Sequence, residues 1–168
     1  MAEPAGKIVP VVLVAVERGG SDEFLLIRRR EPPFVGLWGM PGGKIRPGEH
    51  PADAAGREIL EETGCSLTNL RCLGTVSEFL IEAGVSYAHL MIHLFRASTA
   101  DEAVSESREG ELSWRARKTI VAAPPDMIPS DVRMLSDILL PEKPAHAEVH
   151  IEKEGGRYRL TRFEKTSG

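Results

Sequence analysis

The chain has 168 residues, of which 42% are apolar and 27% are charged, and this is enough to build one globular domain with a sizeable core. Its net charge of −4 and its pI near 5.8 argue against a protein that binds nucleic acid polymers along a basic surface. The only cysteines, Cys65 and Cys72, cannot build a disulfide framework or a zinc site, so they suit a reducing interior.

Two apolar runs near the N-terminus, at 8–17 and 23–28, predict strands that flank a tight turn. The first run could pass for the apolar part of a secretion signal. Pro10, the preceding acidic Glu3 and the many β-branched residues favour a strand instead, and no small-residue cleavage site follows. We therefore expect a cytoplasmic protein with no membrane partner.

A helix is predicted over residues 51–63. Pro51 suits the first helical position, good helix formers follow, and Gly64 is a ready left-handed stop. Gly56 lies beside the apolar side of this helix, where a close neighbour could pack. That apolar side is a stripe of three residues, Ala52, Ala55 and Ile59. The carboxylates of the helix are expected to point away from the stripe.

Three glutamates of this helix, Glu58, Glu61 and Glu62, lie at i, i+3 and i+4. Like charges so close together destabilise a helix unless a positive group lies among them, and a divalent cation is the simplest candidate. The alternative is a solvated acidic face on which Arg57 pairs with Glu61. The preceding turn at 37–44 is rich in glycine and proline, so its backbone can approach a ligand or offer carbonyl oxygens. This neighbourhood favours the metal site.

The stretch from Gly43 to Cys65 resembles the Nudix box, the signature of hydrolases that act on nucleoside diphosphates linked to another group. The matching residues are Gly43, Glu49, Arg57, Glu58, Ile59, Glu61, Glu62 and Gly64. Cys65 is a departure, because the family usually carries a larger aliphatic residue there. Cysteine often behaves as a small buried hydrophobe, so the departure affects packing and hardly the chemistry. As an order of elements, the resemblance extends over about 8–140.

The rest of the chain predicts an extended segment at 67–81, a strand at 86–97, an acidic loop at 99–110, a short strand at 112–114 and helices at 116–123 and 130–140. Mixed strands with helices on both faces give an α/β fold. The family resemblance likewise implies an α/β/α sandwich with a mixed sheet. Alternation in the strand at 86–97 assigns Tyr87 to the face opposite the core, where it could contact a base.

A β-hairpin is predicted at 148–164, behind the linker at 141–144. With Gly155 and Gly156 as its turn, one register satisfies apolar and charged pairs together: Ile151 with Leu160, Glu152 with Arg159, and Glu154 with Arg157. A lone hairpin is marginal in water, so it should dock on the main sheet, dock on a second subunit, or be unstable. We expect a Nudix domain at 1–143 and a hairpin extension at 144–168.

The resemblance implies a site for Mg²⁺, with Mn²⁺ as an alternative ion. Its predicted metal ligands are Glu58, Glu61, Glu62 and a carbonyl of Gly42. The predicted catalytic residues are Arg57, Glu58 and Glu61, and Arg57 orients a carboxylate rather than touching the substrate. The predicted substrate contacts are Arg28, Lys44, Tyr87 and Glu111. The base that activates water is a glutamate of the box or one outside it; Glu109 and Glu111 lie about where some members carry an additional acidic ligand.

The predicted function is Mg²⁺-dependent hydrolysis of a pyrophosphate bond, with a nucleoside triphosphate or a damaged relative cleaved to a nucleoside monophosphate and pyrophosphate. Within the family, the alternative is a pyrophosphatase acting on ADP-ribose or another nucleoside diphosphate sugar. Outside enzymes, the alternative is a Nudix-like module that binds nucleotides without catalysis, although the complete glutamate set of the box argues against it. The expected partner is a small nucleotide, no nucleic acid polymer is expected, and a homodimer is left open.

Overall fold

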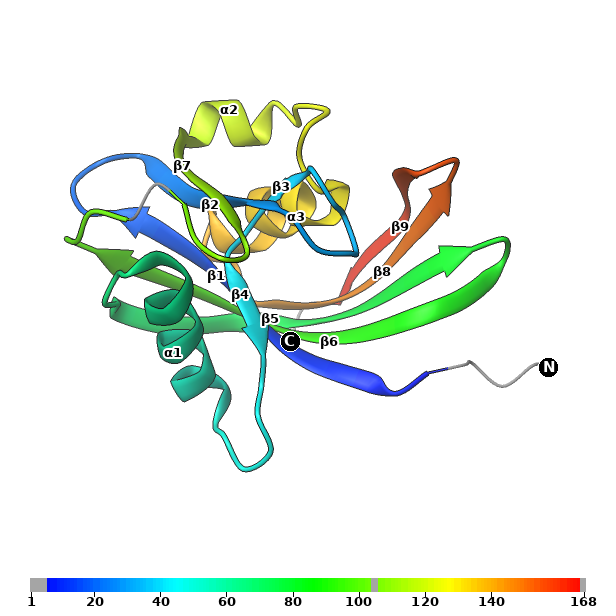
Figure 1. Ribbon diagram of the computed structural model, residues 1–168, viewed down its shortest axis with the longest axis horizontal. Coiled ribbons are helices and arrows are strands. Elements are labelled where there is room, and N and C mark those ends of the chain that lie inside the picture. Colours follow the sequence, from blue (N-terminus) through cyan, green and yellow to red (C-terminus); the bar gives the residue numbers. More distant parts are fainter. Residues whose placement is uncertain (1–5, 104–105, 167–168) are drawn as a thin grey trace.

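The computed structural model describes residues 6–103 and 106–166. Figure 1 shows a curved sheet with helices on both sides. The strands are β1 (Ile8–Arg18), β2 (Glu23–Arg29), β3 (Trp38–Gly39), β4 (Gly42–Lys44), β5 (Thr68–Glu82), β6 (Val85–Thr99), β7 (Gly110–Ala116), β8 (Ala145–Glu154) and β9 (Arg157–Thr166). The helices are α1 (Pro51–Thr63), α2 (Arg117–Val121), α3 (Pro129–Met134) and the π-helical turn η1 (Leu135–Leu139), which continues α3.

All strands belong to one mixed sheet. Its order is β3-β2-β1-β6-β5-β8-β9, and β4 and β7 pair in addition with β1 and β2. The pairs β1–β6 and β5–β8 are parallel, while β1–β2, β1–β4, β2–β3, β2–β7, β5–β6 and β8–β9 are antiparallel. Helix α1 lies on one face and α3 on the other, which confirms the predicted α/β/α architecture.

Two apolar clusters hold these layers together. The larger one packs α3 and η1 against the sheet, with Leu135 and Ile138 completely buried. The other includes Ala55 and Ile59 of α1 and completely buried side chains of β1 such as Val14. A helix with one apolar stripe can bury it only against another element, so α1 is fixed on the sheet with its polar side toward β4 and solvent.

Helix α1 has the predicted bounds, Pro51–Thr63. Its N-cap is His50, whose Nδ1 accepts the N–H of Ala52 at 3.1 Å, and this cap was not predicted. Gly64 has a φ of 75° and donates its N–H to the carbonyl of Leu60, as a left-handed stop requires. Gly56 has no close neighbour: a Cβ added there would meet no atom within 4 Å. The expectation that something packs against Gly56 is therefore wrong.

The C-terminal hairpin has the predicted register, with the three expected residue pairs formed across the turn at Gly155 and Gly156. Of the three placements considered, the structure shows docking on the main sheet, because β8 pairs in parallel with β5. Val149 and Ile151 of β8 are completely buried in the larger apolar cluster. The division of the chain at residue 143 stays a prediction, which a truncation can test.

Several segments differ from the predictions. The turn at 37–44 contains the short strands β3 and β4, because β2 and β1 offer it pairing partners that a local pattern does not show. The acidic loop is shorter than expected, since β6 runs to Thr99 and β7 begins at Gly110; residues 104–105 of that loop lie outside the described ones. Within the described ranges, no helix is both long enough and apolar enough to cross a membrane.

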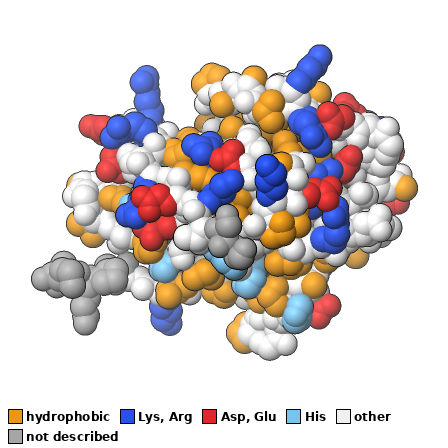
Figure 2. All heavy atoms as spheres, turned by 180° about the vertical axis from the view of Figure 1, so that it is seen from behind, with side chains coloured by type: hydrophobic (Ala, Val, Ile, Leu, Met, Phe, Trp, Pro, Cys, Tyr) orange, Lys and Arg blue, Asp and Glu red, His pale blue; other side chains and the backbone are white. Residues whose placement is uncertain are grey.

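Exposed ion pairs are frequent on the surface, for example Arg133 with Asp137 at 2.7 Å and Arg159 with Glu152 at 2.8 Å. Figure 2 shows the face turned away in Figure 1, where acidic and basic side chains lie near one another among hydrophobic ones. Exposed pairs contribute little to stability because water screens them. The fold therefore depends mainly on the two apolar clusters.

Candidate active site

The contact between α1 and β4 builds the core of the site. A Cβ added at Gly43 would lie 2.5 Å from the carboxyl carbon of Glu58, so only a bare backbone lets this side chain lie across the strand. Gly42 has a φ of 155°, and a Cβ there would lie 2.0 Å from the carbonyl oxygen of Val12 in β1. Both glycines are thus needed to press β4 between β1 and the acidic helix.

Arg57 organises the carboxylates around it. Its Nε and Nη2 donate to the two oxygens of Glu49 at 2.6 and 2.8 Å, and its Nη1 donates to Oε1 of Glu58 at 2.6 Å. Nη2 also donates to the carbonyl of Lys44 at 3.1 Å. These hydrogen bonds lower the pKa of Glu49 to about 2, while Glu49 raises the pKa of Arg57 above its ordinary value. Arg57 therefore holds Glu58 in place, as the predicted orienting role requires.

Glu62 is the most buried carboxylate of the helix, with 5% of its surface exposed. It lies one turn beyond Glu58 and accepts the N–H of Gly42 on Oε2 at 3.1 Å. Burial, followed by the adjacent carboxyl group of Glu109, raises the pKa of Glu62 to about 9. The expectation that the helix carboxylates all point away from the apolar side is wrong for Glu62, because β4 covers it.

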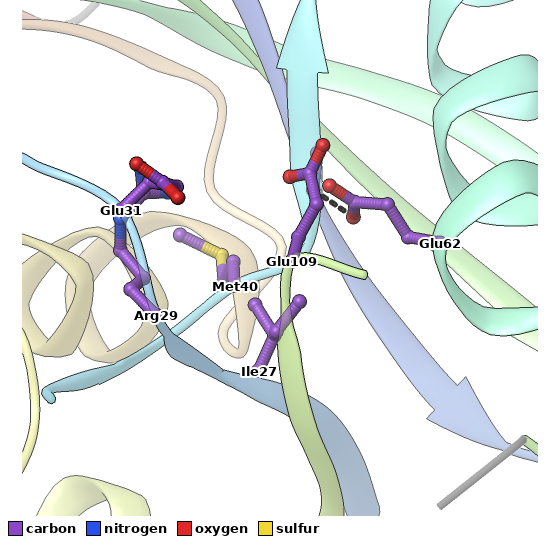
Figure 3. Close-up of a pocket in the computed structure, with 7 residues that line it drawn as sticks. Ile27, Arg29, Glu31, Met40, Glu62 and Glu109 are labelled. Atoms are coloured by element: carbon purple, nitrogen blue, oxygen red, sulfur yellow. Dashed lines mark hydrogen bonds between the residues drawn. The ribbon is translucent and has the colours of Figure 1, made fainter. Parts of the chain in front are cut away.

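A small cavity opens beside Glu62. It is lined by Ile27, Arg29, Glu31, Met40, Gly42, Glu62 and Glu109. Figure 3 shows Glu62 and Glu109 with their carboxyl groups side by side, while Arg29 and Glu31 lie on the opposite side of Met40. The cavity therefore combines a pair of acids, which would bind a cation, with a guanidinium group that could meet a phosphate.

The residues present fit a hard divalent cation. Glu58, Glu62 and Glu109 offer carboxylate oxygens, which Mg²⁺ prefers, and the spacing of Glu58 and Glu62 places them on one side of α1. Within 6–103 and 106–166, no three His, Cys, Asp or Glu side chains are already gathered as a metal-binding group. Side-chain rotation would have to complete such a group, and the ligand roles of Glu58, Glu61, Glu62 and Gly42 stay predictions.

Glu61 lies apart from this cavity. Its side chain is 52% exposed and pairs with Arg57 at 3.3 Å and with Arg46 at 3.4 Å. The pair with Arg57 is the one expected for a solvated acidic face. The three glutamates are thus divided: Glu58 and Glu62 face β4, whereas Glu61 faces solvent.

The predicted substrate contacts are not gathered around the cavity. Arg28 and Glu111 lie opposite each other on β2 and β7 with 3.9 Å between their charged groups, both exposed. Lys44 is exposed, and it takes part in the site through its backbone carbonyl, which accepts a hydrogen bond from Arg57. Arg29, the neighbour of Arg28 in β2, lines the cavity instead, because successive residues of a strand point to opposite faces. Glu109 lines the cavity from the loop just before β7. The roles of Arg28, Lys44 and Glu111 stay predictions.

Tyr87 lies near the start of β6 and is not among the residues that line the cavity beside Glu62. Its side chain is 39% exposed, and burial together with a contact to the hydroxyl group of Tyr158 raises its pKa to about 12. Glu78 is also near enough to contribute to that shift. Tyr87 thus belongs to a group with Tyr158 and Glu78, which come from β9 and β5 and which the sequence did not connect with it.

A family model described as the NUDIX domain matches residues 7–138. The chain belongs to the Nudix family. Its resemblance to the Nudix box is thereby confirmed, and Cys65, the departure from that box, is completely buried in the apolar cluster under α1, as a small hydrophobe would be. Nudix proteins of this kind are hydrolases, so the chain is an enzyme, and hydrolases of the family generally use a divalent metal.

Relatives and solved structures agree with this assignment. The uncharacterized Nudix hydrolase YvcI of Bacillus subtilis is 35% identical over 117 residues, which are 68% of this chain and 70% of that protein. An oxidized purine nucleoside triphosphate hydrolase of Danio rerio is 33% identical over 109 residues, which are 64% of this chain and 65% of that protein. The crystal structure of a MutT protein from Bacillus halodurans has the same fold, with a TM-score of 0.75 at 23% identity over 94% of this chain and 97% of that one.

Proposed function

We propose that this Nudix hydrolase cleaves a nucleoside triphosphate or an oxidised relative to a nucleoside monophosphate and pyrophosphate, with Mg²⁺ as its ion. The observation that carries the proposal is the cavity beside Glu62. Glu62 and Glu109 form an acidic pair in this cavity, and Arg29 lines the same cavity. A polyphosphate with its cation brings both the positive charge that the acids need and the negative charge that Arg29 needs.

The relatives support a triphosphate rather than a nucleoside diphosphate sugar. The hydrolase of Danio rerio, named for oxidized purine nucleoside triphosphates, is similar to this chain over most of its length. ADP-ribose is the alternative substrate within the family and serves as a comparison in the test. A small nucleotide as partner, a cytoplasmic location and Mn²⁺ as an alternative ion belong to the same proposal; both cysteines are free thiols, which suits a reducing interior.

When bound, the divalent cation would offset the charge of the phosphates and lower the pKa of the attacking water. The chain itself supplies three things. Glu58 and Glu62 would hold the cation, Arg57 keeps Glu58 oriented, and Arg29 would meet a phosphate oxygen. Glu109 is placed to accept a proton from the attacking water, since its carboxyl group lies next to that of Glu62.

The test is hydrolysis in ¹⁸O-labelled water with Mg²⁺. The panel holds the common nucleoside triphosphates, 8-oxo-dGTP and ADP-ribose, and products are resolved by mass. We expect a monophosphate and pyrophosphate from a triphosphate, with the label in one of the two because water attacks an internal phosphorus. Release of orthophosphate alone would reject this cleavage. Rapid turnover of ADP-ribose alone would show that the substrate is a nucleoside diphosphate sugar and not a triphosphate, while the proposed metal site would still stand.

A further inference from the structure

Three consecutive arginines lie where β2 ends, and they contact different parts of the molecule. Arg29 lines the cavity of the site, whereas the exposed side chain of Arg28 pairs with Glu111. Arg30 is the first residue after β2, and its side chain lies on the loop that leads into β7. That loop carries Glu109. Arg30 therefore links the end of β2 to the segment that presents the proposed base.

Arg30 holds this loop at three points. Its backbone N–H donates to the carbonyl of Glu109 at 3.2 Å. Its Nη1 donates to the carbonyl of Ser107 at 3.0 Å, and its Nη2 forms an ion pair with Glu106. A guanidinium group is a rigid fork of donors, so it can bind two acceptors of one turn together. Arg30 thus ties the turn at 106–110 to the end of β2.

The turn is also connected within itself and to the sheet. The N–H of Ser107 donates to the carbonyl of Gly110 at 2.8 Å, and Oγ of Ser107 accepts the N–H of Glu109 at 3.3 Å. Gly110 is buried and lies so close to β2 that a Cβ there would overlap the carbonyl oxygen of Arg28. The backbone of Glu109 is therefore fixed on its C-terminal side by the sheet and on its N-terminal side by Ser107 and Arg30.

Glu109 needs such support, because its carboxyl group lies beside that of Glu62 (Figure 3). Glu62 is buried, whereas Glu109 is exposed. Two carboxylates repel each other when both are charged, and an exposed side chain on a loop can relieve that repulsion by moving into water. The contacts of Arg30 oppose this movement, since they hold the backbone from which Glu109 extends.

The ion pair by itself would not have this effect. The side chains of Arg30 and Glu106 are 47% and 62% exposed, and an exposed pair contributes little to stability because water screens it. The hydrogen bonds to the carbonyls of Ser107 and Glu109 differ from it, because they fix the path of the backbone and do not merely join two flexible side chains. Arg30 is therefore expected to matter little for global stability and considerably for the place of Glu109.

We propose that Arg30 is a positioning residue, which holds the turn at 106–110 so that the carboxyl group of Glu109 stays beside Glu62 and within reach of the attacking water. The inference rests on the proposed function, because it takes Glu109 as the group that accepts a proton from that water. Arg30 acts through Glu109 and is assigned no contact with the substrate or the cation.

Steady-state kinetics at saturating Mg²⁺ compare the wild type with Arg30→Gln, Glu109→Gln and the double variant. Arg30→Gln keeps the backbone N–H and loses the contacts of the guanidinium group. We expect its kcat to fall by about 10-fold with KM within about twofold, because a displaced base slows proton transfer and leaves phosphate binding unchanged. Glu109→Gln should lower kcat by roughly 10² to 10³-fold. The double variant should stay within about threefold of Glu109→Gln, because Arg30 then has no base to position.

Hydrogen exchange of the full-length chain reports on the turn without any reaction. In Arg30→Gln, the amides of 106–110 should exchange about 10-fold faster, since the turn opens more readily, while those of α1 keep their protection. Arg18→Gln is the matched control, because Arg18 also pairs with an acid of the segment between β6 and β7, Glu102, at 2.6 Å. It should change neither kcat nor the exchange at 106–110. Melting temperatures establish that every variant is folded.

The outcomes separate this inference from the proposed function. Unchanged exchange at 106–110 in Arg30→Gln overturns the inference, whatever the enzyme hydrolyses. A double variant whose loss in kcat is the product of the two single losses also overturns it, because Arg30 would then act independently of Glu109. Full activity in Glu109→Gln leaves no base to position and overturns the inference, while the hydrolysis itself stands. If no nucleotide is cleaved by the wild type, the proposed function fails, and faster exchange in Arg30→Gln still supports Arg30 as the residue that holds the turn.

Discussion

Glu62 combines three features that an ordinary surface glutamate lacks: it is buried, it accepts the N–H of Gly42, and it lies against Glu109. A carboxylate in such a place is kept ionised most easily by a bound cation. The loss of its charge should therefore affect the reaction far more than the fold.

We expect Glu62→Gln to lower kcat by roughly 10² to 10⁴-fold, because several kcal/mol of transition-state stabilisation by the metal are lost. The amide oxygen of the new side chain can still accept the N–H of Gly42, so the melting temperature should not fall. Steady-state kinetics at saturating Mg²⁺ measure the effect. Asp53→Asn is the control, since Asp53 is exposed in the first turn of the same helix. Unchanged turnover in Glu62→Gln would remove Glu62 from the metal site.

Glu78 makes stability depend on pH. Its pKa is raised from 4.5 to about 7 in the folded chain, so between these values the folded state holds a proton that the unfolded state has released. The free energy of unfolding should therefore fall as pH rises from about 4.5 to 7, and the whole penalty is present above 7. Glu78→Gln removes this contribution.

Thermal unfolding of Glu78→Gln and of the wild type at pH 5 and pH 8 measures the pH-dependent contribution of Glu78 to stability. The variant should gain relative stability at pH 8 compared with pH 5. Asp131 is present in both proteins, but its charge acts on Glu78, so the measured difference includes the interaction between the two acids. A difference in melting temperature that is the same at both pH values would show that Glu78 keeps an ordinary pKa.

At the scale of elements, the distance between α1 and β4 determines whether the carboxylates reach the cavity. Gly43→Ala puts a Cβ 2.5 Å from the carboxyl carbon of Glu58, so Glu58 or the strand has to shift. A displacement of about 1 Å in a catalytic group is enough to lower kcat roughly 10²-fold. We expect that loss with the fold retained, measured by steady-state kinetics and circular dichroism.

Gly56→Ala is the matched change in the same segment. A Cβ at Gly56 meets no atom within 4 Å, and alanine is about 1 kcal/mol more favourable than glycine inside a helix. The melting temperature should rise by roughly 2 to 4 °C with activity unchanged. Equal activity in Gly43→Ala and Gly56→Ala would refute the argument that β4 must be bare at Gly43.

At the scale of the whole molecule, the hairpin is joined to the sheet that carries the site. Strand β8 pairs with β5 from Gly74 to Glu82 and buries Val149 and Ile151 completely. None of the residues that we assign to the hydrolytic step lies in the hairpin. The extension is therefore expected to matter for stability rather than for the hydrolytic step.

A chain that ends after Leu140 tests this division. Loss of the side chains that β8 buries should lower the melting temperature by roughly 10 °C or more. Below that temperature, kcat per folded molecule should stay within about tenfold of the value for the full chain. A tenfold change corresponds to about 1.4 kcal/mol of activation free energy, and no residue assigned to the hydrolytic step has been removed. A truncated chain that is folded but inactive would show that the hairpin completes the catalytic site.

The sequence determined what depends on local spacing. The bounds of α1, the Nudix box, the strands at 8–17 and 23–28 and the register of the hairpin all follow from residue periods, caps and turns, which act over a few positions of the chain. The family and the enzyme class followed from the box for the same reason, because its residues share one helix and the turn before it.

Only the tertiary structure decided which carboxylates meet. Glu109 reaches Glu62, and Glu78 reaches Asp131, across sequence separations of about fifty residues that no periodic pattern encodes. Burial likewise separated Glu62 from Glu61, although the two are neighbours in the helix, because β4 covers one side of α1 and leaves the other in water. Local sequence sets the direction of a side chain along its own element, whereas the elements packed against it set its neighbours, its exposure and its pKa.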